Sequence, residues 1–195
     1  MSSPFGEHVD VPVERHDTGE TYRMVSIDAG YEASDGDIAS IVLACNEPLV
    51  YRFLFRDKLE GRVYDERDAR DFVEWARGGW ISGKHLVFLV RDPNDVIAAC
   101  IDVGEADETG RGFSGYWASA FHSGVMTNAV ECLAGLAMDV GYLTLYSLVE
   151  EENLRSLAVL KRAGFTHVGF QDYALTFMDR PVGKTVRLRR YERAL

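Results

Sequence analysis

The order of strand-like and helix-like segments constrains this chain more than any other feature of its sequence. Apolar runs at 85–91 and 96–103 flank the turn RDPND. This pattern predicts an antiparallel hairpin, because proline fixes φ and Asx side chains bond the local backbone. Farther along, strand-like runs at 112–120 and 142–149 are each followed by a helical pattern that ends at a glycine. Antiparallel strands followed by strand–helix units predict an α/β fold, with a mixed sheet and helices on its faces.

The remaining strand-like segments lie near the two ends of the chain. We expect a first strand at 21–27 and two closing strands at 165–177 and 185–192, joined by the turn DRPVGK. Residues 1–20 are expected to be an irregular N-terminal extension, which leaves 21–195 as the domain. Within the extension, one alternating group resembles a short edge strand: Val9, Val11 and Val13.

Two helices are expected between the first strand and the hairpin. The first is capped by Ser34 or Asp35 and ends at Pro48. The second covers 66–80, where acidic residues crowd the first turn and favour the helix dipole. A chain of 195 residues with 47% hydrophobic content is long enough for one well-buried core, so we expect a single domain.

Charge and sorting signals narrow the classes of partner. The net charge of −10 argues against a nucleic-acid partner, whose phosphates reward Lys and Arg, and suits a cationic one such as an amine. No run approaches the roughly 18 apolar residues of a membrane helix. The N-terminus lacks the basic-then-apolar pattern of a signal peptide. We therefore expect a cytoplasmic protein with no membrane partner.

Cysteines and histidines give no sign of a metal site or a disulfide framework. Cys45, Cys100 and Cys132 are far apart and lie in apolar contexts, so buried reduced thiols are the better interpretation. The five histidines form no HExxH or similar spacing. We expect no metal.

Two loop-to-helix junctions carry candidate chemistry. In YWASAFHSGVMTNAV, Gly124 precedes a helix whose unpaired N–H groups could hold a phosphate, although a single glycine is weak support. In VEEENLRSLAVLKRAGF, Asn153 is a natural helix cap and Ser156 follows three residues later. Spacing alone favours the interpretation that Asn153 only caps the helix and that the Ser156 hydroxyl faces solvent.

Taken together, these segments resemble the GNAT superfamily of N-acetyltransferases, and within it the ribosomal-protein N-terminal acetyltransferase (RimJ/RimL-like) branch. The resemblance covers about 21–193, and NEPLVYRFL and the last two strands also match that branch. The residues that carry it are Gly115, Tyr116, Trp117, Gly124, Thr127, Ala129, Asn153, Ser156, Leu160, Gly164 and Phe165.

The resemblance implies a fold in which two parallel strands splay apart and admit acetyl-CoA as co-substrate. It implies that the pantetheine arm pairs with the backbone of Trp117, Ala118 and Ser119 and is bonded by Asn153. Ser156 would protonate the departing CoA thiolate. The pyrophosphate would sit on the loop formed by His122, Ser123, Gly124, Val125, Met126 and Thr127.

The sequence departs from the family pattern at the phosphate loop and at the general base. The family's loop reads Gln/Arg-x-x-Gly-x-Gly/Ala, where this chain has Phe121, Gly124 and Met126. The carboxylate that often precedes the GYW motif is also missing, since Phe113 and Ser114 stand there. The base is left open among a water molecule and four nearby residues: Asp102, Glu105, Asp107 and His122.

Two functions therefore remain. The first is an acetyl-CoA-dependent N-acetyltransferase that acts on a small-molecule amine or a peptide N-terminus. The second is a GNAT-like CoA-binding or regulatory domain with weak or absent catalysis. An edge strand in the C-terminal hairpin is where a second copy would pair to form a homodimer.

Overall fold

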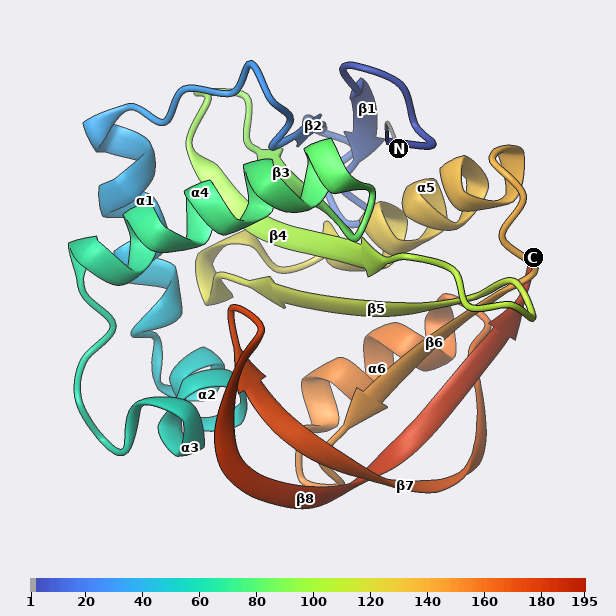
Figure 1. Cartoon of the computed structure of the whole chain (residues 1–195). Helices are drawn as coiled ribbons and strands as arrows, with labels where there is room; N and C mark the ends of the chain where they lie inside the picture. Colours follow the sequence, from blue (N-terminus) through green and yellow to red (C-terminus); the bar gives the residue numbers. More distant parts are fainter. Residues whose placement is uncertain (1–2) are drawn as a thin grey trace.

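One mixed sheet of eight strands organises the molecule, in the order β1-β2-β3-β4-β5-β6-β8-β7 (Figure 1). The structure is a computed structural model that describes residues 3–195. The strands are β1 (Asp10–Glu14), β2 (Thr21–Ser26), β3 (His85–Arg91), β4 (Ile97–Gly104), β5 (Arg111–Ala118), β6 (Thr144–Val149), β7 (Thr166–Phe177) and β8 (Arg180–Ala194). The helices are α1 (Asp35–Cys45), α2 (Pro48–Val50), a π-helical turn η1 (Tyr51–Phe55), α3 (Arg56–Leu59), α4 (Glu66–Ser82), a 3-10 turn η2 (Ala120–His122), α5 (Met126–Asp139) and α6 (Leu154–Arg162).

The first five strands form an antiparallel half-sheet. The predicted hairpin is β3–β4, closed by the turn in which Asp95 has a φ of 65°. The expectation that residues 1–20 are irregular is corrected by β1, which pairs with β2 from Asp10↔Val25 to Glu14↔Thr21. The physical reason is the alternation around Val13, whose side chain is buried in the core.

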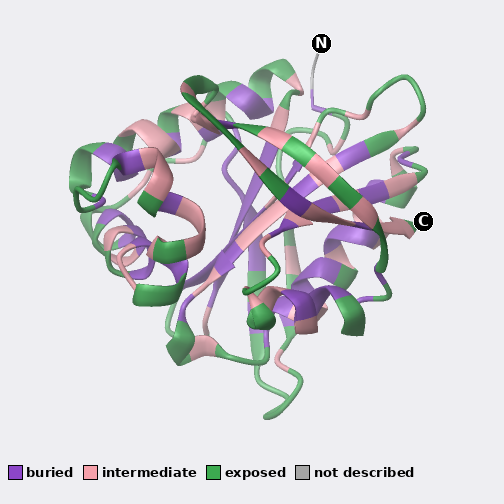
Figure 2. Ribbon diagram, turned by 90° about the horizontal axis from the view of Figure 1, so that it is seen from below, coloured by how far each residue is buried: buried purple, intermediate pink, exposed green. Residues whose placement is uncertain are grey.

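Helices cover both faces of the sheet. Alternate residues of β3 divide between two cores: Phe88 packs with the side that α5 and α6 cover, whereas Leu89 packs with α1 and α4. Both expected helices are present, with Ser34 capping α1 and Asp65 capping α4 through complete capping boxes. Seen from below, the central strands are buried, while β7 and β8 cross in front with mostly exposed and intermediate residues (Figure 2).

The chain between α1 and α4 differs from the sequence-based expectation. Pro48 was expected to end the first helix, but α1 ends at Cys45 and Pro48 instead begins α2. Proline is suited to this place because the first turn of a helix needs no N–H donor. The chain then continues through η1 and α3, which brings Lys58 beside the sheet.

The closing strands form a long hairpin with a tighter turn than expected. DRPVGK was expected to be the turn, but Phe177 pairs with Arg180, which leaves only Met178 and Asp179 between the strands. Both turn residues have positive φ, 49° and 63°, as a two-residue hairpin turn requires. Pro181 and Gly183 therefore lie inside β8.

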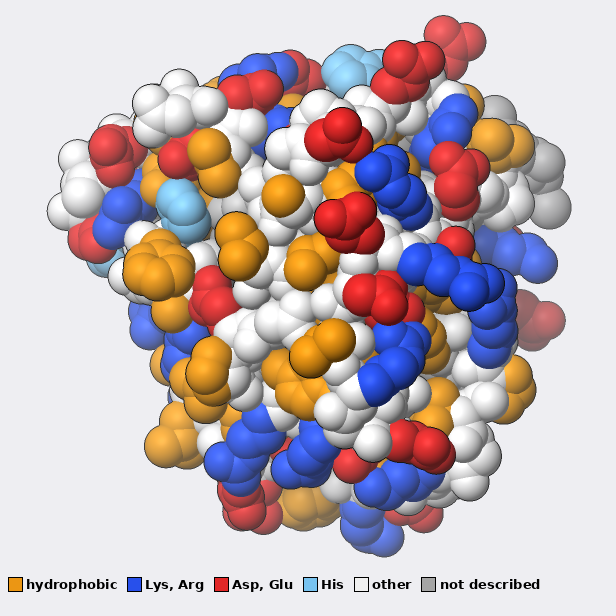
Figure 3. All heavy atoms as spheres, turned by 90° about the vertical axis from the view of Figure 1, so that its left-hand side faces the viewer, with side chains coloured by type: hydrophobic (Ala, Val, Ile, Leu, Met, Phe, Trp, Pro, Cys, Tyr) orange, Lys and Arg blue, Asp and Glu red, His pale blue; other side chains and the backbone are white. Residues whose placement is uncertain are grey.

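The exposed surface is mixed in character. On the face over α1 to α4, the left-hand side of Figure 1, acidic, basic and hydrophobic side chains are interspersed (Figure 3). No single helix in residues 3–195 is long and apolar enough to cross a membrane, although the bent pair 35–45 and 48–59 meets the length and composition criteria together.

Candidate active site

The site begins where β5 and β6 stop pairing. These parallel strands share only three register pairs, from Arg111↔Thr144 to Phe113↔Tyr146. Just beyond, the Ser147 hydroxyl donates to the Ser114 carbonyl at 2.7 Å and closes the base of the fork. From there the strands diverge around a cavity of about 860 Å³, which is the splayed arrangement that the resemblance implied.

The backbone of β5 presents alternate residues to this cleft. The Ser119 N–H donates to the Ala98 carbonyl at 3.0 Å, so Ser119 faces β4 and not the cleft. Along a strand of an antiparallel pair, the N–H and C=O groups of successive residues point alternately toward and away from the partner strand. Those of Tyr116 and Ala118 therefore face the cleft, as those of Ser114 do. Of the three residues expected to bind the pantetheine arm, Ala118 has its backbone in position. Trp117 instead buries its side chain in the core beside α1 and α4.

The phosphate loop lies at the wide end of the cleft. Gly124 has a φ of 94°, a conformation that L side chains rarely adopt. The N–H groups of residues 124–127 donate no hydrogen bond within the described residues, as expected at the start of α5. Met126 is buried and directs its side chain into the core, so its bulk does not obstruct the backbone. This part of the site can hold an anion through backbone donors.

The hairpin between β1 and β2 supports this loop. The His16 N–H donates to the Gly124 carbonyl at 3.2 Å, and a Cβ on Gly124 would come within 2.7 Å of an Asp17 carboxylate oxygen. Arg15 holds that carboxylate through Nε at 2.7 Å, and this ion pair lowers the pKa of Asp17. No pattern in the sequence indicates that the N-terminal extension would contact the phosphate loop.

The remaining loop residues have separate roles. The His122 Nδ1 lies 3.2 Å from the Tyr22 hydroxyl, and His122 and Ser123 line the cavity. Val125 is fully buried beneath the start of α5. The Thr127 hydroxyl accepts a hydrogen bond from Arg162 Nε at 3.1 Å, which places a guanidinium of α6 beside the free N–H groups.

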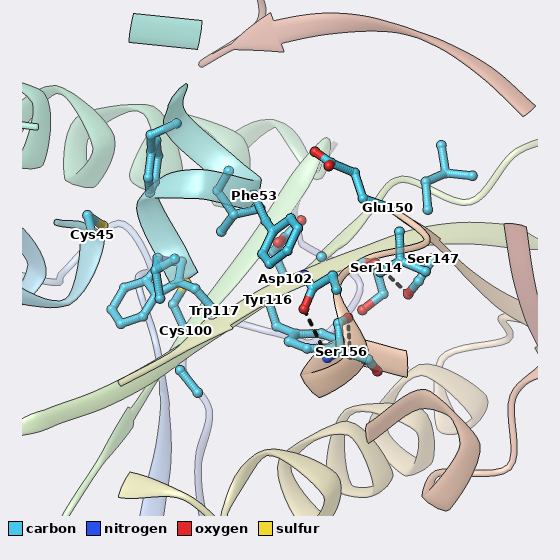
Figure 4. A pocket seen from close by; sticks show the side chains of 18 of the residues that line it. Cys45, Phe53, Cys100, Asp102, Ser114, Tyr116, Trp117, Ser147, Glu150 and Ser156 are labelled. Atoms are coloured by element: carbon cyan, nitrogen blue, oxygen red, sulfur yellow. Dashed lines mark hydrogen bonds between the residues drawn. The ribbon is translucent and has the colours of Figure 1, made fainter. Parts of the chain in front are cut away.

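The start of α6 brings Asn153 and Ser156 to the cleft. Asn153 caps the helix, since its Oδ1 accepts the Ser156 N–H at 3.2 Å, while both residues line the cavity. The Ser156 hydroxyl lies 2.8 Å from the Tyr116 hydroxyl, which reaches across from β5 (Figure 4). Burial raises the pKa of Tyr116, so the phenol is protonated. The pair can hold and donate a proton at the mid-point of the cleft.

Asp102 of β4 points into the cavity from the face of the sheet opposite to α6 (Figure 4). Burial raises its pKa to about 7, against an ordinary value of 3.8, while the charge of Lys58 lowers it. The carboxylate accepts no hydrogen bond within residues 3–195. It lies close to Gly115, where a Cβ would come within 3.0 Å of Oδ1. A carboxylate with a pKa near neutrality can accept a proton from an amine.

The other candidate bases are less suited to that role. Glu105 lines the cavity but is exposed. Asp107 is bonded to Thr109 and to the Arg111 N–H, and these bonds lower its pKa. His122 belongs to the phosphate loop, and its Nδ1 is engaged by the Tyr22 hydroxyl at 3.2 Å. Asp102 therefore becomes the strongest of the four candidates.

Three residues of the site were not singled out by sequence reasoning: Tyr116 as a partner of Ser156, Lys58 and Arg162. Tyr116 was noted only as part of the GYW motif, and its contact with Ser156 spans 40 positions. Lys58 follows Pro48 in a segment whose helices have no regular apolar period. In residues 3–195 no three His, Cys, Asp or Glu side chains gather in a geometry that could hold a metal ion.

Comparison with known proteins agrees with this geometry. The family model for the acetyltransferase (GNAT) domain matches residues 31–166. The chain therefore belongs to the GNAT acetyltransferase family, and as a member of it is an acyltransferase. Comparison with curated proteins gives no match.

Solved structures share the fold at low sequence identity. Mycobacterium smegmatis RimJ in complex with CoA-disulfide aligns with a TM-score of 0.71 and 16% identity, covering 100% of this chain and 90% of that one. The microcin C7 self-immunity acetyltransferase MccE, in complex with acetyl-CoA and AMP, gives 0.66 and 18%, with coverage of 88% and 92%. Spermidine N-acetyltransferase from Vibrio cholerae, in complex with CoA and spermine, gives 0.62 and 12%, with coverage of 89% and 95%.

Proposed function

We propose that the protein is an acetyl-CoA-dependent N-acetyltransferase that transfers an acetyl group to a primary amine by direct attack. The observation that carries this proposal is the position of two proton-handling groups on opposite sides of one cleft. Asp102 enters from β4, and the Ser156–Tyr116 pair spans α6 and β5. Direct transfer from a thioester to an amine needs a proton acceptor beside the amine and a proton donor beside the departing sulfur.

The cleft supplies contacts for each part of the co-substrate. The free N–H groups of residues 124–127 and the Arg162 guanidinium suit the pyrophosphate. The peptide groups of Tyr116 and Ala118 can pair with the pantetheine amides, and the Asn153 side chain lines the same passage. The thioester would then lie beside Ser156, and its carbonyl would be polarised by a backbone N–H of β5.

The residues on the two sides then complete the transfer. Asp102 accepts a proton from the acceptor ammonium, and the neutral amine attacks the thioester carbon. The new C–N bond forms as the C–S bond breaks, and the Ser156 hydroxyl gives a proton to the leaving thiolate. Tyr116 stands behind Ser156 at 2.8 Å and can replace that proton. The attacking nitrogen loses its second proton through water to the Ser156–Tyr116 pair, which restores both hydroxyls, and Asp102 releases its proton to solvent. The products are an N-acetylated amine, free CoA and one proton.

The alternative, a CoA-binding or regulatory domain without turnover, rested on the atypical phosphate loop. Met126 is buried and does not block the loop, and Asp102 supplies a candidate for the missing carboxylate. These two observations favour the enzyme.

A calorimetric titration with acetyl-CoA, followed by a thiol-release assay against a panel of primary amines, tests the proposal. We expect micromolar binding and acceptor-dependent release of CoA. Absence of binding would refute both functions, and binding without release for any amine would favour the regulatory domain.

A further inference from the structure

The acceptor side of the cavity is covered by the tip of the β7–β8 hairpin. Asp179 at that tip accepts a hydrogen bond from Trp75 Nε1 at 2.8 Å and lies 3.1 Å from His85 Nε2. Lower on the hairpin, Lys184 pairs with Asp57 of α3 at 2.8 Å. These contacts join the C-terminal hairpin to α3, α4 and β3, and Asp179 at its tip lines the cavity, so the hairpin covers this side of the space that the acceptor enters.

Aromatic packing holds the same cover in place. The Phe177 ring lies edge-on to Phe55 and to Tyr64, with centroids 6.4 Å away in both cases. The cover is thus attached by two hydrogen bonds, an ion pair and two ring contacts. A covered cavity favours a small acceptor over the terminus of a folded protein, because a folded chain would have to displace all of them.

Two opposite charges without partners face this covered space. Lys58 is half-buried and lines the cavity, yet forms no ion pair or hydrogen bond within residues 3–195. Asp102 likewise lacks a partner there. The two are near enough for each to shift the pKa of the other, and too far apart to form an ion pair. An acceptor can therefore occupy the space between them.

Another carboxylate, Glu150, also lines the cavity, but charged side chains of both signs already surround it. Burial raises its pKa, as do Asp57 and Glu152, whereas Arg56 and Arg52 lower it. The pKa values of Lys58 and Asp102 are shifted by burial and by each other, and not by either arginine. The unmatched pair in the covered space is therefore Lys58 and Asp102.

The chemistry of that pair defines the acceptor. A simple amine would neutralise Asp102 but would push water away from Lys58 and leave its ammonium unpaired, which is costly in a desolvated site. A molecule with both an ammonium and an anionic group would pair with both residues. We propose that the acceptor is a small amino-acid-like zwitterion, with its amine at Asp102 and its carboxylate at Lys58. This inference rests on the proposed function and names the substrate class for it.

The affinity of the protein for candidate acceptors tests this inference, and it can be measured without turnover. Calorimetry on the CoA-loaded protein would compare α-, β- and γ-amino acids with their carboxamides. The amide keeps the amine but lacks the anion, and an α-amino amide also mimics a peptide N-terminus. We expect at least one acid to bind at least tenfold more tightly than its amide.

Variants of Lys58 test whether this residue causes the preference for the acid over its amide. Lys58→Met should weaken binding of that acid by tenfold or more and change the amide less than twofold, while Lys58→Arg should retain the preference. Lys84→Met, at an exposed lysine that lines the mouth of the same cavity, is the matched control and should change neither ligand.

The comparison of acids with their amides on the wild-type protein tests the proposal even if a variant fails to fold. Equal or tighter binding of every amide, or no binding of any acid, would overturn the proposal. A preference that survives Lys58→Met would also overturn it. Absence of CoA release in the thiol assay would instead refute the proposed function and leave the binding preference as measured.

Discussion

Replacing Asp102 by Asn should make the protein more stable and less active at the same time. The carboxylate has a pKa of about 7 in the folded protein, against an ordinary value of 3.8. A carboxyl group with a raised pKa destabilises the folded state when ionised. This cost is absent below the unfolded pKa, grows as the pH rises from about 4 to about 7, and is complete above that. The carboxamide of the Asp102→Asn variant never ionises, so the variant avoids the cost.

The size of the effect follows from the two pKa values. With about 1.36 kcal/mol for each pH unit, the ionised carboxylate costs about 1.7 kcal/mol at pH 5 and about 4 kcal/mol at pH 8.5. Asp102 is only half-buried, so water that enters the cavity screens the charge in part, and these figures are upper limits. The pKa of about 7 already includes the favourable charge of Lys58, so no separate correction is needed for it. The advantage of Asp102→Asn should therefore widen between pH 5 and pH 8.5, by about 2.5 kcal/mol at most.

Urea unfolding at several pH values measures this difference, and the thiol-release assay measures the loss of the base. We expect kcat/KM of the wild type to rise through a pKa near 7, and the variant to lose about 10²- to 10⁴-fold in rate together with that limb of the profile. CoA affinity should be unchanged. Glu105→Gln, at an exposed acid that lines the same cavity, is the control and should leave stability and rate unaffected.

A variant whose stability advantage stays constant or shrinks between pH 5 and pH 8.5 would refute the claim that this carboxylate is desolvated. A variant with wild-type turnover and an unaltered pH profile would refute its role as the base.

Three further substitutions test the other parts of the site. Ser156→Ala should lower kcat about ten- to a hundredfold and leave the Kd for CoA within twofold, because its hydroxyl is needed for the leaving thiolate; an equal loss in both would mean that Ser156 only binds. Gly124→Ala should cost about 1–3 kcal/mol in urea unfolding and weaken CoA binding, because of the positive φ and the nearby Asp17 carboxylate; an unchanged protein would show that the loop relaxes freely. Arg162→Gln should weaken CoA about tenfold and reduce the salt dependence of binding, whereas Lys161→Gln, at the exposed neighbour, should not; equal effects would indicate only a general loss of charge.

Much of this fold was predictable because its signals are local. The β3–β4 hairpin follows from a Pro-Asn turn between apolar runs. The helices α1 and α6 follow from caps at Ser34 and Asn153, and α4 follows from the acidic residues in its first turn. The two-residue turn at Met178–Asp179 was missed because Met178 is an unusual choice for positive φ. The segment after Pro48 was missed because its three short helical pieces are defined by their packing on the sheet.

The candidate site was harder to foresee than the fold. Asn153 and Ser156 were recognised because they share one helix turn, and Gly124 because it precedes a helix. The pairing of Tyr116 with Ser156 and the relation of Lys58 to Asp102 join segments 40 and more residues apart. Distances of that kind depend on strand order and register, which no local pattern in the sequence encodes. The environment that raises the pKa of Asp102 is likewise a property of the assembled cleft.

The short pairing of β5 with β6 has a mechanical consequence for the whole domain. Within residues 3–195 the sheet pairing between the five-stranded half and the three-stranded half is limited to three register pairs, supported by the Ser147–Ser114 hydrogen bond and by the ring of Phe113 in β5, which stacks on Tyr173 of β7. The two halves can therefore open as partly separate cooperative units, with β6, β7, β8 and α6 in the second. A long ligand bound along the fork would contact both halves and stabilise their association. Cohesion of the domain would then depend on the supply of its own co-substrate, so that cells rich in the ligand would hold a stiffer and more protease-resistant protein.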